Sequence, residues 1–201
     1  ADVVKAILLD PEARAEYTQQ PTYFGKVKEP LIRGVQMVRA FGLETLATLE
    51  PQWPEHQHNQ APLSAPSVFN FFASDFSPVG ELSTAGLAAP ELQIINDTFM
   101  VRNANHAAWW SLWAPTVAEL DSSDGRTMTI DYSVYTPMLA DGPEAYIDFL
   151  NIVLLSGSMP DEMRQTLIDY DNATSSWQED IARIKELTFL VTSSPQFAVQ
   201  R

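Results

Sequence analysis

The chain of 201 residues carries 12 basic and 26 acidic side chains, and its formal net charge at pH 7 is −14. Its apolar content of 45% and charged content of 19% are those of a globular protein, long enough to form one sizeable core. The shortage of Lys and Arg argues against nucleic acid as a partner, and no apolar run reaches the roughly 18 residues of a membrane span. The absence of cysteine excludes disulfides, thiolate metal sites and cysteine nucleophiles.

The first part of the chain predicts two helices followed by a long irregular connection. Residues 2–16 have helical periodicity, and so do residues 26–41, where Gly42 is a plausible stop. The predicted apolar face of the second helix consists of Val27, Leu31, Val35 and Val38. Gly34 inside the second helix costs about 1 kcal/mol relative to Ala, which predicts close packing of another element there. Residues 43–63 contain three prolines and no clear periodicity. Long loops of this kind are either functional or mobile.

The middle of the chain predicts a short helix and a long one. Pro66 suits the first turn of a helix that ends near Phe72. Residues 90–113 predict the longest helix of the chain, with apolar residues on more than one face, and such a helix is expected to be central to its domain.

Three more helices are predicted near the C-terminus, over residues 143–155, 158–170 and 175–191. The first two form a helical hairpin through the linker "SGSM". Strand patterns are nearly absent, so the sequence predicts an all-α fold: one helical domain over residues 1–201, with a single core, long irregular loops and a C-terminal helical hairpin. Because the chain opens within a helical pattern, we expect it to be the C-terminal portion of a longer protein.

Three segments resemble a known family in the same order along the chain: "GKVKEPLIRGVQMVRAFG" (25–42), "PSVFNFFASDFSPVGEL…GLAAPELQI" (66–94) and "LTFLVTSSPQFAVQR" (187–201). They resemble the C-terminal part of the bacterial domain-of-unknown-function family numbered 1800. The resemblance implies that an N-terminal portion is missing and that the protein is extracytoplasmic, either periplasmic or secreted. It implies no activity and no catalytic residues.

The segment 64–82 is the first candidate site, with two interpretations. Its phenylalanines, which include Phe72 and Phe76, could wall a cleft whose polar groups are Asn70, Asp75 and Glu81, suited to a sugar or another neutral polar ligand. Alternatively, the phenylalanines belong to the core, and Asn70 and Asp75 hold the loop backbone. The second interpretation is favoured, because aromatic residues beside turns are common in cores.

Polar residues in "RNANHAAWW" (102–110) form the second candidate site. Arg102, Asn103 and His106 interrupt an otherwise apolar helix, so those that are buried need partners. One interpretation is a structural network in which Arg102 pairs with Asp75, Glu81 or Glu91. The other makes His106 a general base or a ligand. The structural role is the more common one for a lone histidine.

A pair of tryptophans and a pair of histidines each allow a functional and a structural interpretation. Trp109 and Trp113 lie four residues apart and would form a sugar-stacking surface if exposed, although core positions are favoured. His56 and His58, with Glu55 nearby and His106 as a conceivable third ligand, have the only metal-like spacing. Two histidines in a loop are usually surface residues, so no metal and no cofactor is predicted.

The leading functional hypothesis is therefore a non-enzymatic binding or assembly module. Its partner would be the missing N-terminal portion or another protein chain, with carbohydrate as a further candidate, and an exposed apolar patch along residues 26–41 would support this hypothesis. The alternative is a hydrolase acting on a polysaccharide or a similar polar substrate. Its candidate catalytic residues are Asp75, Glu81, Glu91 and His106. The candidate ligand-binding residues are Asn70, Phe72, Asp75, Phe76, Arg102, Asn103 and His106.

Overall fold

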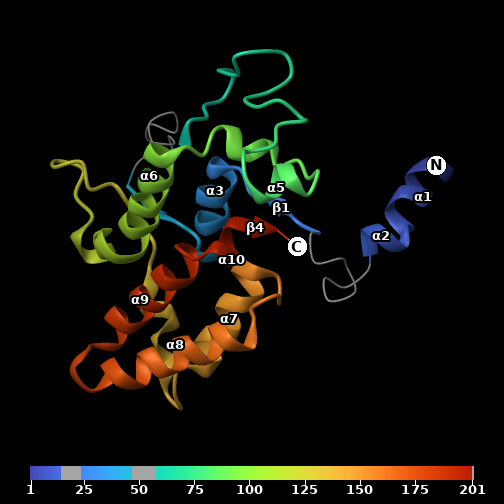
Figure 1. Cartoon of the computed structure of the whole chain (residues 1–201). Coiled ribbons are helices and arrows are strands. Elements are labelled where there is room, and N and C mark those ends of the chain that lie inside the picture. The colour runs from blue at the N-terminus through green and yellow to red at the C-terminus, as the bar shows by residue number, and fades with distance from the viewer. Residues whose placement is uncertain (15–23, 47–57, 201) are drawn as a thin grey trace.

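The computed structural model describes residues 1–14, 24–46 and 58–200, and helices dominate these segments (Figure 1). The strands are only two residues long. One apolar core contains buried residues from Met37 to Phe197. The prediction of an all-α fold with a single core is confirmed. Within the described segments, no helix is both long enough and apolar enough to cross a membrane.

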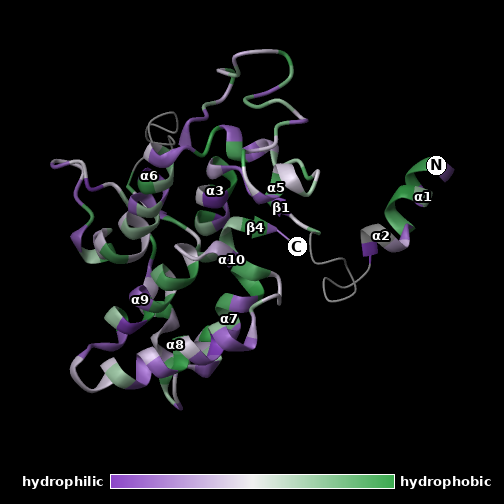
Figure 2. Cartoon of the chain, viewed as in Figure 1, coloured by the Kyte–Doolittle hydropathy of each residue, from purple (hydrophilic) through white to green (hydrophobic). Residues whose placement is uncertain are grey.

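The two N-terminal helices lie apart from the rest of the described chain (Figure 1). They are α1 (Asp2–Leu9) and α2 (Pro11–Arg14). Asp10 between them has an extended conformation (φ −59°, ψ 135°), as expected for a residue before proline, and this interrupts the helix predicted over residues 2–16. Helix α1 is largely apolar yet has no buried residue (Figure 2), and its exposed apolar side chains are Val3, Val4, Ile7, Leu8 and Leu9.

The centre of the core lies among three C-terminal helices: α7 (Glu144–Leu155), α8 (Asp161–Thr174) and α9 (Asp180–Thr192). They pack on one another, and α7 and α9 also pack on η5 (Tyr132–Leu139), a 3₁₀ segment. Fully buried side chains supply the packing: Tyr146, Ile147, Leu150, Leu154, Ile184, Leu187 and Val191.

The predicted hairpin of α7 and α8 is present, with small shifts at its ends. Ser156 ends α7 in the left-handed conformation (φ 54°), one residue before the predicted stop at Gly157. The Ser158 hydroxyl donates back to the Leu155 carbonyl (2.6 Å) instead of capping α8, which begins at Asp161. The short 3₁₀ turn η6 (Ser175–Trp177) then separates α8 from α9.

Helix α3 (Pro30–Phe41) begins with its proline in the first turn and ends at Gly42 (φ 75°), as predicted. The predicted apolar face is buried only in part: Val38 packs against the core, and Leu31 is half-buried. Met37 and Phe41 are buried, whereas Val35 is 47% and Ile32 48% exposed. Gly34 lies against a neighbouring element, so the side of α3 that packs on the rest of the fold differs in part from the predicted side.

Two short antiparallel pairings connect distant parts of the chain. β1 (Lys26–Val27) pairs with β4 (Val199–Gln200), which follows α10 (Pro195–Ala198). β2 (Glu44–Thr45) pairs with β3 (Met128–Thr129). The first pairing brings the start of α3 next to the C-terminal segment of the chain.

The single helix predicted over residues 90–113 is wrong. The region consists of the 3₁₀ turn η2 (Pro90–Gln93), then α6 (Asp97–Ala108), then a π-helical turn η3 (Trp109–Trp113). Asn96 separates the first two, because its side chain accepts from the Phe99 amide (3.2 Å) and so caps α6. Two short elements flank this region: α5 (Glu81–Thr84) and η4 (Val117–Glu119).

Candidate functional site

The segment 64–82 is a largely exposed loop, not a helix and not core. Ser67 and Asn70 form an isolated bridge around a tight turn, with Asn70 in the left-handed region (φ 85°) and the Phe69 amide bonded to the Ser67 hydroxyl (3.1 Å). These local bonds compete with a helix. Phe69 is 82% exposed, so the interpretation that places this phenylalanine in the core is wrong.

The other candidates in this segment are spread over its surface. Phe72 and Phe76 are half-buried, and Phe76 is held by a backbone bond to Ala89 (2.9 Å). Asp75 is exposed in the loop, and Glu81 is exposed at the start of α5.

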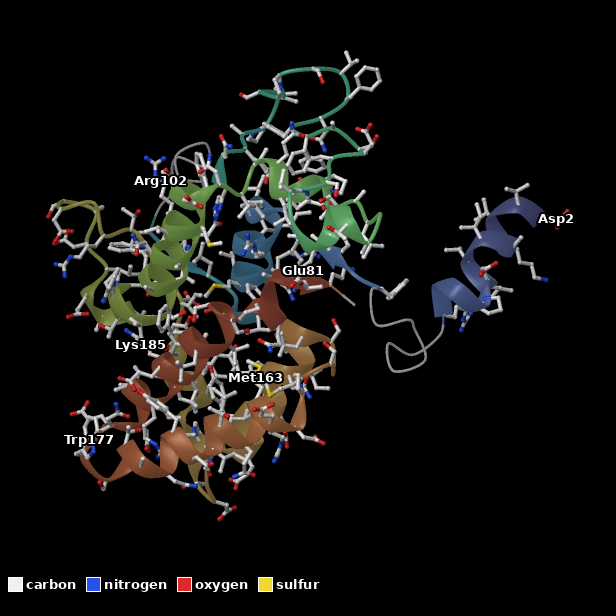
Figure 3. The ribbon with its side chains drawn as sticks, in the orientation of Figure 1. Asp2, Glu81, Arg102, Met163, Trp177 and Lys185 are labelled. Carbon is white, nitrogen blue, oxygen red and sulfur yellow. The ribbon has the colours of Figure 1, made fainter. Side chains whose placement is uncertain are left out.

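Glu91 and Arg102 have partners other than those considered from the sequence. Glu91 is buried, and its Oε1 lies 3.5 Å from the Lys26 ammonium. Arg102 is exposed on α6, with its guanidinium over the Phe99 ring (5.2 Å). Figure 3 shows Arg102 and Glu81 in different parts of the fold. The carboxylates proposed for hydrolysis therefore do not gather around Arg102.

Asn103 and His106, in contrast, line a cavity of about 330 Å³. Its walls are α3, α6, η2 and the chain from Thr192 to Ala198, together with His58. The apolar lining residues are Val27, Met37, Leu92, Ile95, Met100, Ala104, Ala107, Pro195, Phe197 and Ala198. Neither Asp75, Glu81 nor Glu91 belongs to this lining.

Trp110 fixes the tautomer of His106. The indole Nε1 of Trp110 lies 3.0 Å from Nε2 of His106. Because an indole N–H can only donate, Nε2 is the acceptor, and the neutral ring carries its proton on Nδ1. Burial, with a smaller contribution from His58, lowers the pKa of His106 from 6.5 to about 4. His106 is therefore neutral at physiological pH.

Asn103 fixes the second imidazole in a similar way. Its Nδ2 donates to the Phe99 carbonyl (2.6 Å), so its Oδ1 accepts from Nδ1 of His58 at 3.2 Å. His58 thus keeps Nε2 as a hydrogen-bond acceptor. Burial and the charge of Arg33 lower the pKa of His58, although the bond to Asn103 raises it. The two imidazole rings meet edge to face, with centroids 4.6 Å apart.

Gly34 makes room for both histidines. A Cβ at this position would lie 3.2 Å from Cε1 and Nε2 of His58 and 3.3 Å from Cε1 of His106. Such distances are tighter than ordinary van der Waals contact, so a side chain here would displace the rings. The prediction of close packing at Gly34 is confirmed.

Arg33 supplies the charge of the cavity. Among the described residues, it is the one Lys or Arg side chain in the lining, and these residues contribute no Asp or Glu to it. Its Nε is buried and, within the described residues, has no hydrogen-bond partner. Burial lowers the pKa of Arg33, and no carboxylate offsets this effect. The cavity therefore offers a donor group that protein atoms leave unused.

A metal site does not form from the described residues, which contain no cluster of three His, Asp or Glu side chains able to hold an ion. His56 and Glu55 lie outside the described residues. Nε2 of His106 is occupied by the Trp110 indole, and Nδ1 of His58 by Asn103.

Trp109 and Trp113 face solvent, so the prediction that they are core residues is wrong. They are 48% and 62% exposed, whereas Trp110 between them is buried. The π turn, closed by a bond from the Ala114 amide to the Trp109 carbonyl (2.7 Å), changes the helical period after residue 108.

Arg33 and the role of Trp110 were missed from the sequence. The available signal for Arg33 was an arginine beside a helical glycine, among apolar residues of "PLIRGVQMV". His58 was considered only as a metal ligand, because nothing in the sequence places it beside α3 and α6.

The sequence profile of the family described as "Protein of unknown function (DUF1800)" matches residues 1–199. The chain belongs to this family. Searches of curated proteins and of solved structures gave no match. All three segments that carry the family resemblance contribute to the cavity: Arg33 and Gly34 from the first, Leu92 from the second, and the residues after Thr192 from the third.

Proposed function

We propose that this DUF1800 domain is a non-enzymatic binding module whose ligand occupies the cavity between α3 and α6. The observation that carries the proposal is Arg33, whose buried Nε has no hydrogen-bond partner among the described residues, in a lining to which these residues contribute no other charged side chain. Cavities of this size with few polar groups are typical small-molecule sites. The neutral, hydrogen-bonded histidines are consistent with a positioning role. No observation gathers the carboxylates that the hydrolase alternative requires.

A thermal-shift screen of the chain against small carboxylates, amines and neutral sugars tests this proposal. The variant Ala104→Phe adds a ring at an exposed position of the cavity lining. Ala173→Phe, on the exposed face of α8, makes the same change elsewhere and serves as its control. A ligand-induced shift that Ala104→Phe removes and Ala173→Phe retains supports the cavity as the site. Equal shifts for both variants contradict it.

A second candidate function is self-assembly through α1. Ile7 and Leu8 of this helix are 62% and 64% exposed, and Ile32 and Val35 add the exposed apolar positions on α3 that the assembly hypothesis predicted. Exposed apolar surface of this kind is typical of protein contacts. Sedimentation of the chain as a dimer that Ile7→Glu dissociates would support this function. A monomer with unchanged Ile7→Glu behaviour would contradict it. The extracytoplasmic location stays a prediction.

A further inference from the structure

The chemistry of the cavity also constrains the ligand, if the cavity is the binding site proposed above. Arg33 is the charged residue of the lining, and its guanidinium has no ion pair with a carboxylate of the described residues. A guanidinium in an apolar environment is costly unless an anion accompanies it. The other half of this pair is therefore expected from outside the protein.

Most of the remaining polar groups of the lining are already hydrogen-bonded, and the Nδ1–H of His106 is a neutral donor. The hydroxyls of Thr192, Ser193 and Ser194 donate to backbone carbonyls of α9 at 2.9, 2.7 and 2.7 Å. Nδ1 of His58 donates to Asn103. Arg33 is thus the group with a free donor and a positive charge.

We infer that the ligand is a monocarboxylate with an apolar body, whose carboxylate binds Arg33 and whose body lies against Met37, Ile95 and Phe197. The planar fork of a guanidinium matches a carboxylate and can bind it through two hydrogen bonds. A single cation balances a single negative charge, so a dianionic phosphate fits less well. The apolar side chains of the lining exclude a highly hydroxylated body, such as a free sugar acid.

The size of the cavity limits the length of this body. A volume of about 330 Å³ corresponds to roughly ten water molecules. Short-chain fatty acids and small aryl acids are within this limit, and Nε2 of His58 provides an acceptor for a hydroxyl near the carboxylate. Gly34 leaves room for the His58 ring at this part of the lining, because a side chain at position 34 would displace the ring.

Calorimetric titration of the chain at pH 7.5 with hexanoate, hexanamide and acetate tests the inference. Hexanamide has the shape of hexanoate without its charge, and acetate has the carboxylate without the body. We expect hexanoate to bind and the other two to bind at least roughly tenfold more weakly, the effect of losing a charge-assisted bond or most of the apolar contact.

Variants of Arg33 assign the carboxylate to this residue. Arg33→Met should weaken hexanoate roughly 10- to 100-fold. Arg33→Lys keeps the charge but loses the fork, and should weaken it less. Arg39→Met removes an exposed arginine of the same helix that does not line the cavity, and should leave affinity unchanged. Far-UV circular dichroism checks that each variant is folded.

The outcomes separate this inference from the proposed function. If hexanoate and hexanamide bind equally and Ala104→Phe abolishes both, the cavity is a binding site but the inference of an anionic ligand is wrong. If Arg33→Met and Arg39→Met reduce binding equally, the role of Arg33 is wrong. If none of the three compounds binds and the wider screen shows no shift sensitive to Ala104→Phe, both the inference and the proposed function are contradicted.

Discussion

Two partly buried arginines, Arg183 between α8 and α9 and Arg33 beside the α3–α6 cavity, differ in whether a carboxylate accompanies their charge. Between α8 and α9, Arg183 donates to both oxygens of the buried Asp171, from Nε at 2.9 Å and a terminal nitrogen at 2.6 Å, and also reaches Asp180 at 2.8 Å. These bonds raise the pKa of Arg183. Beside the α3–α6 cavity, burial lowers the pKa of Arg33, and no carboxylate compensates.

The comparison separates a structural region from a candidate binding region. Around α7 to α9, apolar side chains fill the core, and buried polar groups such as Tyr146 and Thr188 bond to each other (2.6 Å). Around α3 and α6 there is a cavity, and Arg33 in its lining has no ion pair with a carboxylate of the described residues. The Arg183–Asp171 pair stabilises the fold because both charges are compensated. A buried charge without a counter-ion, such as that of Arg33, adds no such stabilisation. The unpaired arginine is therefore better explained by binding.

The largest effect on the free energy of unfolding is expected from removing the buried carboxylate that pairs with Arg183. Asp171→Ala leaves Arg183 with only its exposed partner Asp180, and should lower the free energy of unfolding by about 3–5 kcal/mol. Urea denaturation measures this loss. Asp180→Ala is the control, because that side chain is exposed and should cost less than about 1 kcal/mol. Equal losses for the two variants would contradict the distinction.

Acid should destabilise the cavity region through His106. Its pKa is about 4 in the folded chain against 6.5 when unfolded, a difference worth about 3 kcal/mol. Between these values the unfolded chain binds a proton that the folded chain does not. The stabilisation is therefore complete above pH 6.5 and is lost as pH falls toward 4. Urea denaturation at several pH values gives the free energy of unfolding as a function of pH. Between pH 4 and 6.5 its slope should be smaller for His106→Gln than for the natural chain. Identical slopes would show that His106 is not the cause of the acid destabilisation.

A smaller effect is expected from removing the indole donor that fixes His106. Trp110→Phe leaves Nε2 of His106 without its hydrogen bond, and should cost about 1–3 kcal/mol. The bond favours the neutral ring, so its loss should also raise the pKa of His106, which NMR titration of the histidines can follow. Trp109→Phe is the control, since Trp109 faces solvent and should change stability by less than about 0.5 kcal/mol. An unchanged pKa in Trp110→Phe would show that the indole does not control protonation.

The smallest effect on stability is expected at Arg33. It tests most directly whether Arg33 differs from Arg183 in its contribution to stability. Arg33→Met removes a desolvated charge that has no ion pair, so the free energy of unfolding should stay the same or increase by up to about 1 kcal/mol. Arg39→Met, on the same helix and exposed, should be neutral. A loss of more than about 2 kcal/mol in Arg33→Met alone would make Arg33 a structural residue like Arg183.

The correct sequence predictions were those based on long periodic patterns or on the backbone restrictions of proline and glycine. The helices of the C-terminal hairpin, the proline at the start of α3 and the stop at Gly42 follow from side-chain period and backbone restriction, which act locally. Two of the errors occurred where a side chain bonds to nearby backbone. Asn96 caps α6 and interrupts the helix predicted from residue 90, and Ser67 and Asn70 form a turn where a helix was expected.

Half of the candidate site was accessible from the sequence. Asn103 and His106 were recognised as polar interruptions of an apolar helix, and both line the cavity, whereas Asn70, Asp75 and Glu81 lie outside it. His58 and Arg33 reach the same cavity from segments far away in the chain, through the packing of α3 on α6. A lone arginine or histidine in a sequence carries no information about which charges its fold brings near.

The sequence by itself therefore determined the class of fold, the family, the acidic character and the need for close packing at Gly34. These properties depend on composition, local period and short motifs. Only the tertiary structure decided that Arg33 lies in a cavity without an acidic partner, that Trp110 fixes the tautomer of His106, and that Trp109 and Trp113 face solvent. Each of these depends on burial and on contacts between separate segments, and the energy of a charge or a hydrogen bond changes most with its surroundings.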